Sequence, residues 1–146
     1  MKSRTDDMLK YVQFLARRFD KQDTKAVTLI ILYDLNMQPY NEGFVYLRRA
    51  IEVECADSGR TATAGIYPVI SNLFGAYDVQ KPVEQAIRRT IKAAWSERDE
   101  EIWNLFFPIV KGRIPKCPSN KEFITRISCI IELWQSCKEA DYERIE

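Results

Sequence analysis

Histidine is absent from the sequence, which removes the side chain that most often serves as a general base near neutral pH and as a zinc ligand. The sequence also lacks a glycine-rich phosphate loop and a nucleophile elbow. One acidic cluster, Glu97 with Asp99, Glu100 and Glu101, could suggest a metal site, but acidic residues in the first turn of a helix more often complement the helix dipole. We therefore predict no catalytic site, no cofactor and no metal, and we expect a protein that is not an enzyme.

Long hydrophobic runs are also missing. The longest, "AVTLIILY", is far shorter than the roughly 20 residues of a membrane-spanning helix, and no segment resembles a secretory signal. The formal net charge is only +1, so any binding surface for a charged partner must be local. We expect a cytoplasmic protein with no membrane partner.

The four cysteines contain no CxxC pair. Cytosolic chains rarely keep disulfides, so we expect Cys55, Cys117, Cys129 and Cys137 to be reduced and structural. Cys129 and Cys137 lie eight residues apart in a helical pattern, which predicts that both pack as small apolar residues.

Apolar residues recur at helical spacing along the chain, and no strand-like alternation is present. With 46% hydrophobic residues, the chain can form one packed domain, and we predict an all-α, compact multi-helix bundle. We expect an N-terminal helix within residues 1–23, a main domain over 24–138 and a charged tail over 139–146. The nearly all-apolar helix from Thr24 to Asn36 should be central to the core.

Two consecutive segments have the outline of a helix-turn-helix. A predicted helix over residues 66–74 ends at Gly75, and a short connection leads to a second helix, Lys81–Trp95, with Pro82 in its first turn. In this motif the second helix enters the major groove of DNA. A helix-turn-helix therefore places residues 81–95 against base pairs.

The second helix has a polar side that could read bases. Its outward residues are predicted to be Glu84, Gln85, Arg88 and Arg89, with Lys81 and Lys92 at the flanks; the inward ones are Val83, Ala86, Ile87, Ile91 and Ala94. Arginine can bind guanine, glutamine adenine, and glutamate cytosine. An ordinary solvated helix face has the same composition, so spacing alone leaves both interpretations open.

Four motifs in order extend this interpretation: "GFVYLRRAI", "YPVISNLF", "VEQAIRRTIKAAWS" and "PSNKEFI". Together they resemble the C-terminal DNA-binding effector domain of the master response regulator of sporulation initiation in endospore-forming bacteria. The resemblance covers roughly Ala26 to Leu133. It implies a helix-turn-helix domain that binds duplex DNA at a short, partly A·T-rich promoter box, often as tandem copies, and regulates transcription by contacting RNA polymerase.

By this resemblance the base-reading positions are Glu84, Gln85, Arg88 and Arg89. The family usually has arginine where this chain has Gln85, so we expect a different preferred box. Cations in the loop, Lys111, Arg113 and Lys116, lie in a region that is near the DNA backbone or a neighbouring domain in the family. Together with Lys81, Lys92, Lys121 and the helix-opening Ser119 they are the predicted phosphate contacts, with a solvated loop as the alternative.

The family's full-length regulator carries a receiver domain, but only about 25 residues precede the matching region, too few for such a domain. The chain is either an isolated effector domain or a natural stand-alone relative, which Met1 and the patterned N-terminal helix favour. The apolar face of that helix, Met8, Tyr11, Val12, Leu15 and Phe19, would pack onto the domain or mediate a homodimer.

A second function stays open. The near-zero net charge and Gln85 also suit a protein-interaction module on a degenerate effector scaffold, such as an antagonist of the full-length regulator. Failure to select any DNA box would favour this alternative.

Overall fold

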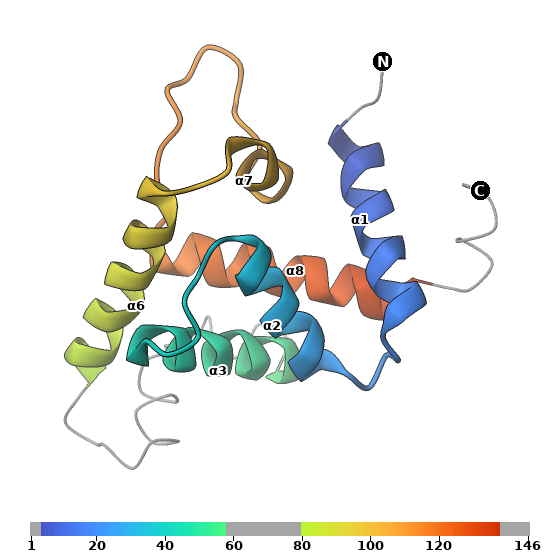
Figure 1. Ribbon diagram of the computed structural model, residues 1–146, viewed down its shortest axis with the longest axis horizontal. Coiled ribbons are helices and arrows are strands. Elements are labelled where there is room, and N and C mark those ends of the chain that lie inside the picture. Colours follow the sequence, from blue (N-terminus) through green and yellow to red (C-terminus); the bar gives the residue numbers. More distant parts are fainter. Residues whose placement is uncertain (1–3, 58–79, 138–146) are drawn as a thin grey trace.

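The computed structural model of the protein describes residues 4–57 and 80–137 (Figure 1). In these ranges the chain forms six helices and no strand: α1 (Arg4–Arg18), α2 (Thr24–Asp34), α3 (Glu42–Asp57), α6 (Gln80–Ser96), α7 (Glu100–Phe106) and α8 (Asn120–Ser136). The all-α prediction is confirmed. The predicted helix over residues 66–74, the turn at Gly75 and the tail over 139–146 lie outside the described residues.

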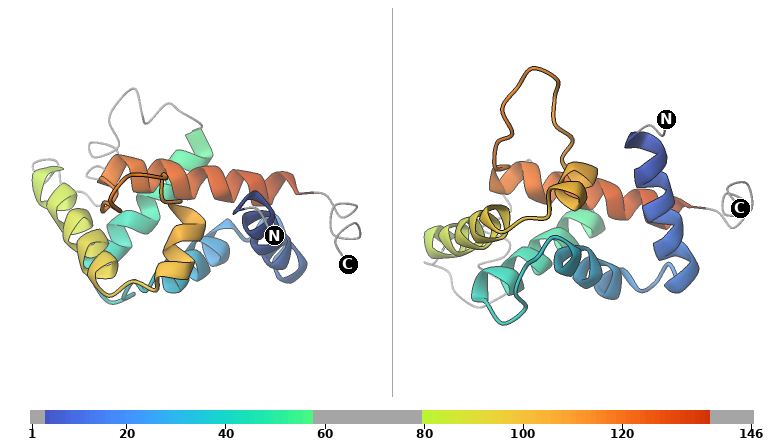
Figure 2. Two further views of the ribbon diagram at one scale, coloured as in Figure 1. Left: turned by 90° about the horizontal axis from the view of Figure 1, so that it is seen from above. Right: turned by 45° about the horizontal axis from the view of Figure 1, so that its top comes forward.

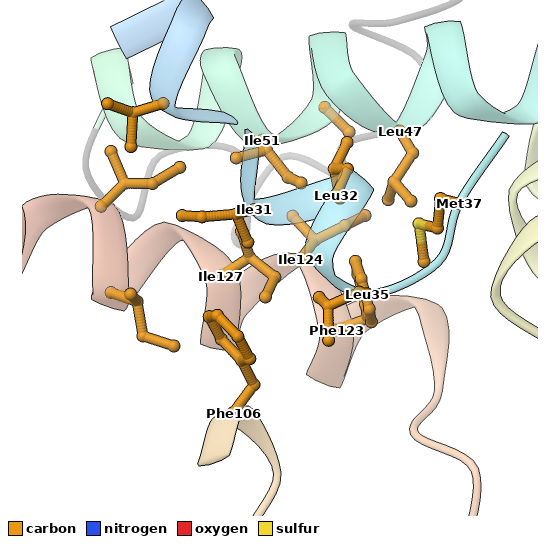
Figure 3. Packing of buried hydrophobic residues seen from close by; sticks show 14 of the residues in the cluster. Ile31, Leu32, Leu35, Met37, Leu47, Ile51, Phe106, Phe123, Ile124 and Ile127 are labelled. Atoms are coloured by element: carbon orange, nitrogen blue, oxygen red, sulfur yellow. The ribbon is translucent and has the colours of Figure 1, made fainter. Parts of the chain in front are cut away.

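Helices α3 and α8 pack directly against each other, and α2 packs against both. Val27, Ile31, Leu32 and Leu35 of α2 and its C-cap are fully buried, as expected for a helix that is apolar nearly all round. Figure 3 shows Ile31, Leu32 and Leu35 between the side chains of α3 and those of α8. The inner face of α8 is also buried: Phe123, Ile124, Ile127, Ile130, Ile131 and Trp134.

Helix α1 joins this core instead of standing apart from it. Met8, Val12 and Leu15 are buried, and the Tyr11 hydroxyl donates a hydrogen bond of 2.6 Å to Asp34 Oδ2 at the end of α2. The Tyr11 ring also meets the Phe106 ring of α7 edge-on, with centroids 5.2 Å apart. Of the two roles open to the N-terminal helix, packing onto the domain is therefore the one observed.

Helices α1 and α6 lie at opposite ends of α8 (Figure 1, Figure 2). Helix α6 is at the N-terminal end of α8 and packs mainly on α3, whereas α1 crosses its C-terminal end. This arrangement leaves one side of α6 open to solvent and separates it from the N-terminal helix.

Close approach of α3 and α6 depends on a glycine. A Cβ added to the buried Gly43 would come within 3.0 Å of both Thr90 Oγ1 and the Ala86 carbonyl. The backbone of α6 thus occupies the space that the side chain of any other residue type at position 43 would need. Gly43 determines how near the two helices come to each other.

The four cysteines are free thiols, as predicted. Cys137 is buried, but Cys129 is exposed, so the prediction that both pack as small apolar residues is wrong for Cys129. The helical phase of Cys129 places it beside, not on, the inner face of α8. Burial raises the pKa of the Cys55 thiol to about 11, which keeps this group protonated near neutral pH. Within the described residues, no helix combines the length and hydropathy that crossing a membrane requires.

Candidate nucleic-acid interface

Helix α6 has a buried inner face and an exposed outer face. Val83, Ile87 and Ile91 are at most 1% exposed, and Ala86, Thr90 and Ala94 are also buried. Five of the six predicted outer residues are exposed: Lys81, Glu84, Gln85, Arg89 and Lys92. Because they recur at intervals of three and four residues, they form a single stripe along the helix. These five residues and Arg88 are here called the α6 outer face.

Arg88 differs from its neighbours on the α6 outer face. Its side chain is half-buried, and its Nη1 donates a hydrogen bond of 2.6 Å to the carbonyl of Pro118, just before α8. A guanidinium has five N–H donors in a planar arrangement, so this bond leaves others available to a ligand. Arg88 therefore has a tertiary contact in addition to any contact it makes outside the molecule.

The beginning of α8 has a capping box, formed by Ser119 and Glu122. The Ser119 hydroxyl accepts from the Glu122 N–H at 3.1 Å, and the Ser119 N–H donates to Glu122 Oε1 at 3.4 Å. The next residue, Asn120, is buried, and its Nδ2 donates a hydrogen bond of 3.0 Å to the Glu84 carbonyl of α6. The N-terminus of α8, where the helix dipole favours anions, is thus fixed beside the α6 outer face.

Four of the predicted phosphate-binding cations lie in the segment that leads into α8 and in the first turn of α8. Lys111, Arg113 and Lys116 are exposed in the loop between α7 and α8, and Lys121 is exposed in the first turn of α8. The loop projects beyond α7, away from α2 and α3 (Figure 1). The predicted base-reading and phosphate-binding residues therefore fall in three segments, of which the structure joins α6 directly to the start of α8.

The acidic cluster after α6 has a structural role. Asp99 is the N-cap of α7, and its Oδ1 accepts from the N–H groups of Glu101 and Ile102 at 3.0 and 3.4 Å. Glu100 and Glu101 lie in the first turn, where the helix dipole favours negative charge. Among residues 4–57 and 80–137, no group of three or more cysteine, aspartate or glutamate side chains could hold a metal ion.

The structure adds one residue that the sequence does not indicate. Asn120 contacts α6 although 36 residues separate it from Glu84, and it lies in a capping sequence that accounts for it locally. The sequence indicates that Asn120 begins α8, but nothing in it indicates a bond to the Glu84 carbonyl. Only the crossing of α6 and α8 reveals this contact.

An open groove lies beneath the loop that follows α7. Its lining is mainly apolar and includes Trp95, Phe107 and Pro115, and its volume is about 690 Å³. Ile114 is 91% exposed and Val110 is 59% exposed in the same loop. Two cations of the loop also line this groove: Arg113 and Lys116.

Residues 28–131 of the 146-residue chain match a family model described as sporulation initiation factor Spo0A C terminal. The match includes all of α3, α6 and α7 and most of α2 and α8, and it leaves α1 outside. Both the α6 outer face and the start of α8 therefore lie within the matched region.

Proposed function

Because the chain belongs to the family of Spo0A C-terminal domains, which bind DNA and are not enzymes, we propose that it is a sequence-specific regulator of transcription that inserts α6 into the DNA major groove. The observation that carries the proposal is the α6 outer face, which exposes five polar or charged residues while the opposite face is packed on the core. A DNA-binding regulator would act in the cytoplasm.

In this proposal Glu84, Gln85, Arg88 and Arg89 read base edges. Gln85 can make two hydrogen bonds to adenine, and arginine can make two to guanine. Arg88 would keep Nη1 on the Pro118 carbonyl and use its remaining donors, whereas Arg89 is exposed and has its whole guanidinium available. The four residues would thus contribute unequally to sequence preference.

Phosphate contacts would flank the reading helix. Lys81 and Lys92 lie toward the two ends of α6, and Ser119 with Lys121 opens α8 beside it. Lys111, Arg113 and Lys116 would extend the contact along the DNA backbone. These cations supply a local attraction that the net charge of +1 does not provide. RNA polymerase is the partner through which such a regulator would act, and tandem DNA boxes would bring two copies together as a homodimer.

Selection of bound duplexes from a random pool tests the proposal. At physiological salt we expect one short box to be enriched, and the mass of the complex gives the number of copies bound. The matched control carries Gln85→Ala, Arg88→Ala and Arg89→Ala together; it should fold and enrich no box. Absence of any enriched box with the unmodified protein would refute sequence-specific binding.

The apolar groove favours a second candidate, a protein-interaction module that antagonises the full-length regulator. Ile114 and Val110 line the groove and expose apolar side chains to solvent. This function predicts that the chain lowers DNA binding by the purified full-length regulator and that Ile114→Asp abolishes the effect. Retention of this effect in Arg89→Ala, which changes only the α6 outer face, would separate the two surfaces.

A further inference from the structure

Two hydrogen bonds connect the first turns of α6 to the start of α8. Asn120 Nδ2 donates to the Glu84 carbonyl at 3.0 Å, and Arg88 Nη1 donates to the Pro118 carbonyl at 2.6 Å. Glu84 and Arg88 are four residues apart and so lie on the same side of α6. Their partners are two residues apart, and the four residues make a compact tether, here called the α6–α8 tether.

The tether complements the packing of α6 on α3. On the α3 side, the contact at Gly43 with Ala86 and Thr90 sets the distance between helix backbones. The buried side chains Val83 and Ile87 set which face of α6 turns inward, but apolar packing is not directional and controls the exact rotation about the helix axis only weakly. A hydrogen bond has a preferred direction, so a second attachment on another side of α6 restricts that rotation.

Asn120 cannot itself be a DNA contact, because its side chain is only 6% exposed. Its Oδ1 has no hydrogen-bond partner within the described part of the chain, so the amide is oriented by its Nδ2 bond to α6. An apolar residue at this position would avoid an unpaired buried oxygen but would supply no directional contact. The Asn120 amide therefore contributes mainly the directional hydrogen bond to α6, and contributes less through the burial of its side chain.

We infer that Asn120 is a positioning residue for sequence reading: its bond to the Glu84 carbonyl sets the rotation of α6 so that Glu84 and Gln85 point toward base edges. Arg88 completes the tether through Pro118. The inference rests on the proposed reading of DNA by α6. It also makes the capped end of α8 a part of the reading surface.

The test compares Asn120→Ala and Asn120→Asp with Ser119→Ala. Aspartate has nearly the shape of asparagine, but its carboxylate cannot donate to the Glu84 carbonyl. Ser119→Ala removes the cap of the same helix end and a proposed phosphate contact, but no bond to α6. The measured quantity is the ratio of the Kd for unrelated duplex to the Kd for the selected box, at one salt concentration. Because phosphate contacts carry no sequence information, their loss weakens binding to both duplexes alike and leaves the ratio of the two Kd values unchanged.

We expect this ratio to fall about tenfold or more in both Asn120 variants, a loss comparable to a mismatched base pair, and to be retained in Ser119→Ala. In Asn120→Ala the affinity for unrelated duplex should stay close to that of the unmodified protein. Equal losses for the selected box and unrelated duplex would overturn the inference, because they would indicate a purely structural role for Asn120.

Amide hydrogen exchange of the free protein provides a readout without DNA. The Ile87 and Arg88 amides should exchange faster in the Asn120 variants than in Ser119→Ala, while the Ala94 amide, beyond the tether, should not change. Unchanged exchange at Ile87 and Arg88 would overturn the tether even if a box is selected. If the unmodified protein selects no box, the proposed function fails and the reading role with it, whatever the exchange shows.

Discussion

Adjacent residues of the same type have different surroundings on α6. Arg88 is half-buried and donates to the Pro118 carbonyl, whereas Arg89 is exposed beside a shallow hollow at the start of α3. The sequence motif does not distinguish them, since both lie on the outer side of an amphipathic helix. Substituting each arginine should therefore distinguish a role in holding the fold, at Arg88, from a role in DNA binding alone, at Arg89.

Alanine substitutions at these two positions form a matched pair. Each should weaken binding to the selected box by about 1–3 kcal/mol and relax preference at one base pair, measured by titration against boxes changed at single positions. Only Arg88→Ala should also lower the free energy of unfolding, by about 1 kcal/mol, because it removes a hydrogen bond within the protein. Equal unfolding free energies for the two variants would show that the Arg88 bond does not stabilise the fold.

At the scale of helices, the α3–α6 crossing depends on Gly43. Gly43→Ala should destabilise the protein by about 1–3 kcal/mol, measured by denaturant unfolding, because the new methyl group overlaps Thr90 Oγ1 and the Ala86 carbonyl. Alanine has the better helix propensity by about 1 kcal/mol, so a loss can only come from the overlap.

A second substitution tests how much of the loss comes from the overlap with the Thr90 side chain and how much from the overlap with the Ala86 backbone. Thr90→Ala added to Gly43→Ala removes the hydroxyl but leaves the Ala86 backbone in place, so only part of the stability should return. Full recovery would mean that the helix backbones can separate without cost. In that case Gly43 would not set the position of α6.

Helix α1 is attached through Tyr11, whose hydroxyl bonds Asp34. Tyr11→Phe should lower the free energy of unfolding by about 1 kcal/mol, the contribution of one hydrogen bond. Tyr33→Phe removes the same hydroxyl from a side chain that is 51% exposed and serves as the control, with an expected change within about 0.5 kcal/mol. Equal effects of the two substitutions would contradict a specific attachment of α1 to α2.

The hydrogen-bonded hydroxyl of Tyr11 also predicts a pH dependence of the free energy of unfolding. Burial, and then the bond to the Asp34 carboxylate, raises the pKa of Tyr11 well above its ordinary value. The folded state thus holds the phenol proton more tightly than the unfolded state, so the stabilisation is complete below the ordinary pKa of about 10 and declines as pH rises above it. The stability difference between the unmodified protein and Tyr11→Phe should therefore shrink above about pH 10.

At the scale of the whole molecule, attraction to DNA must come from one surface, because the net charge is only +1. Lys92→Ala should weaken binding to all duplexes and reduce the slope of log Kobs against log salt by about one. Lys25→Ala makes the same charge change at an exposed position of α2, a helix that packs on α3 and α8, and it should leave the slope unchanged. Equal slopes for both variants would argue against a localised DNA surface.

Within the described residues, the sequence by itself determined the helical fold, the inner face of α6 and the capping box that opens α8. The Ser119–Glu122 capping box and the buried face of α6 follow from residues three or four positions apart, which become neighbours whenever a helix forms. The resemblance of four short motifs likewise identified the family that the match over residues 28–131 established. Local chemistry and spacing were enough for these conclusions.

The tertiary structure alone decided which helices meet and how the outer face of α6 is held. The bonds from Asn120 to Glu84 and from Arg88 to Pro118 join residues 36 and 30 positions apart, and the contact of Gly43 with Ala86 joins two separate helices. No helical period relates such residues, because their proximity depends on the distance and angle at which whole helices pack. Cys129 is a different case, because its helical phase beside the inner face of α8 can be read from the sequence and accounts for its exposure.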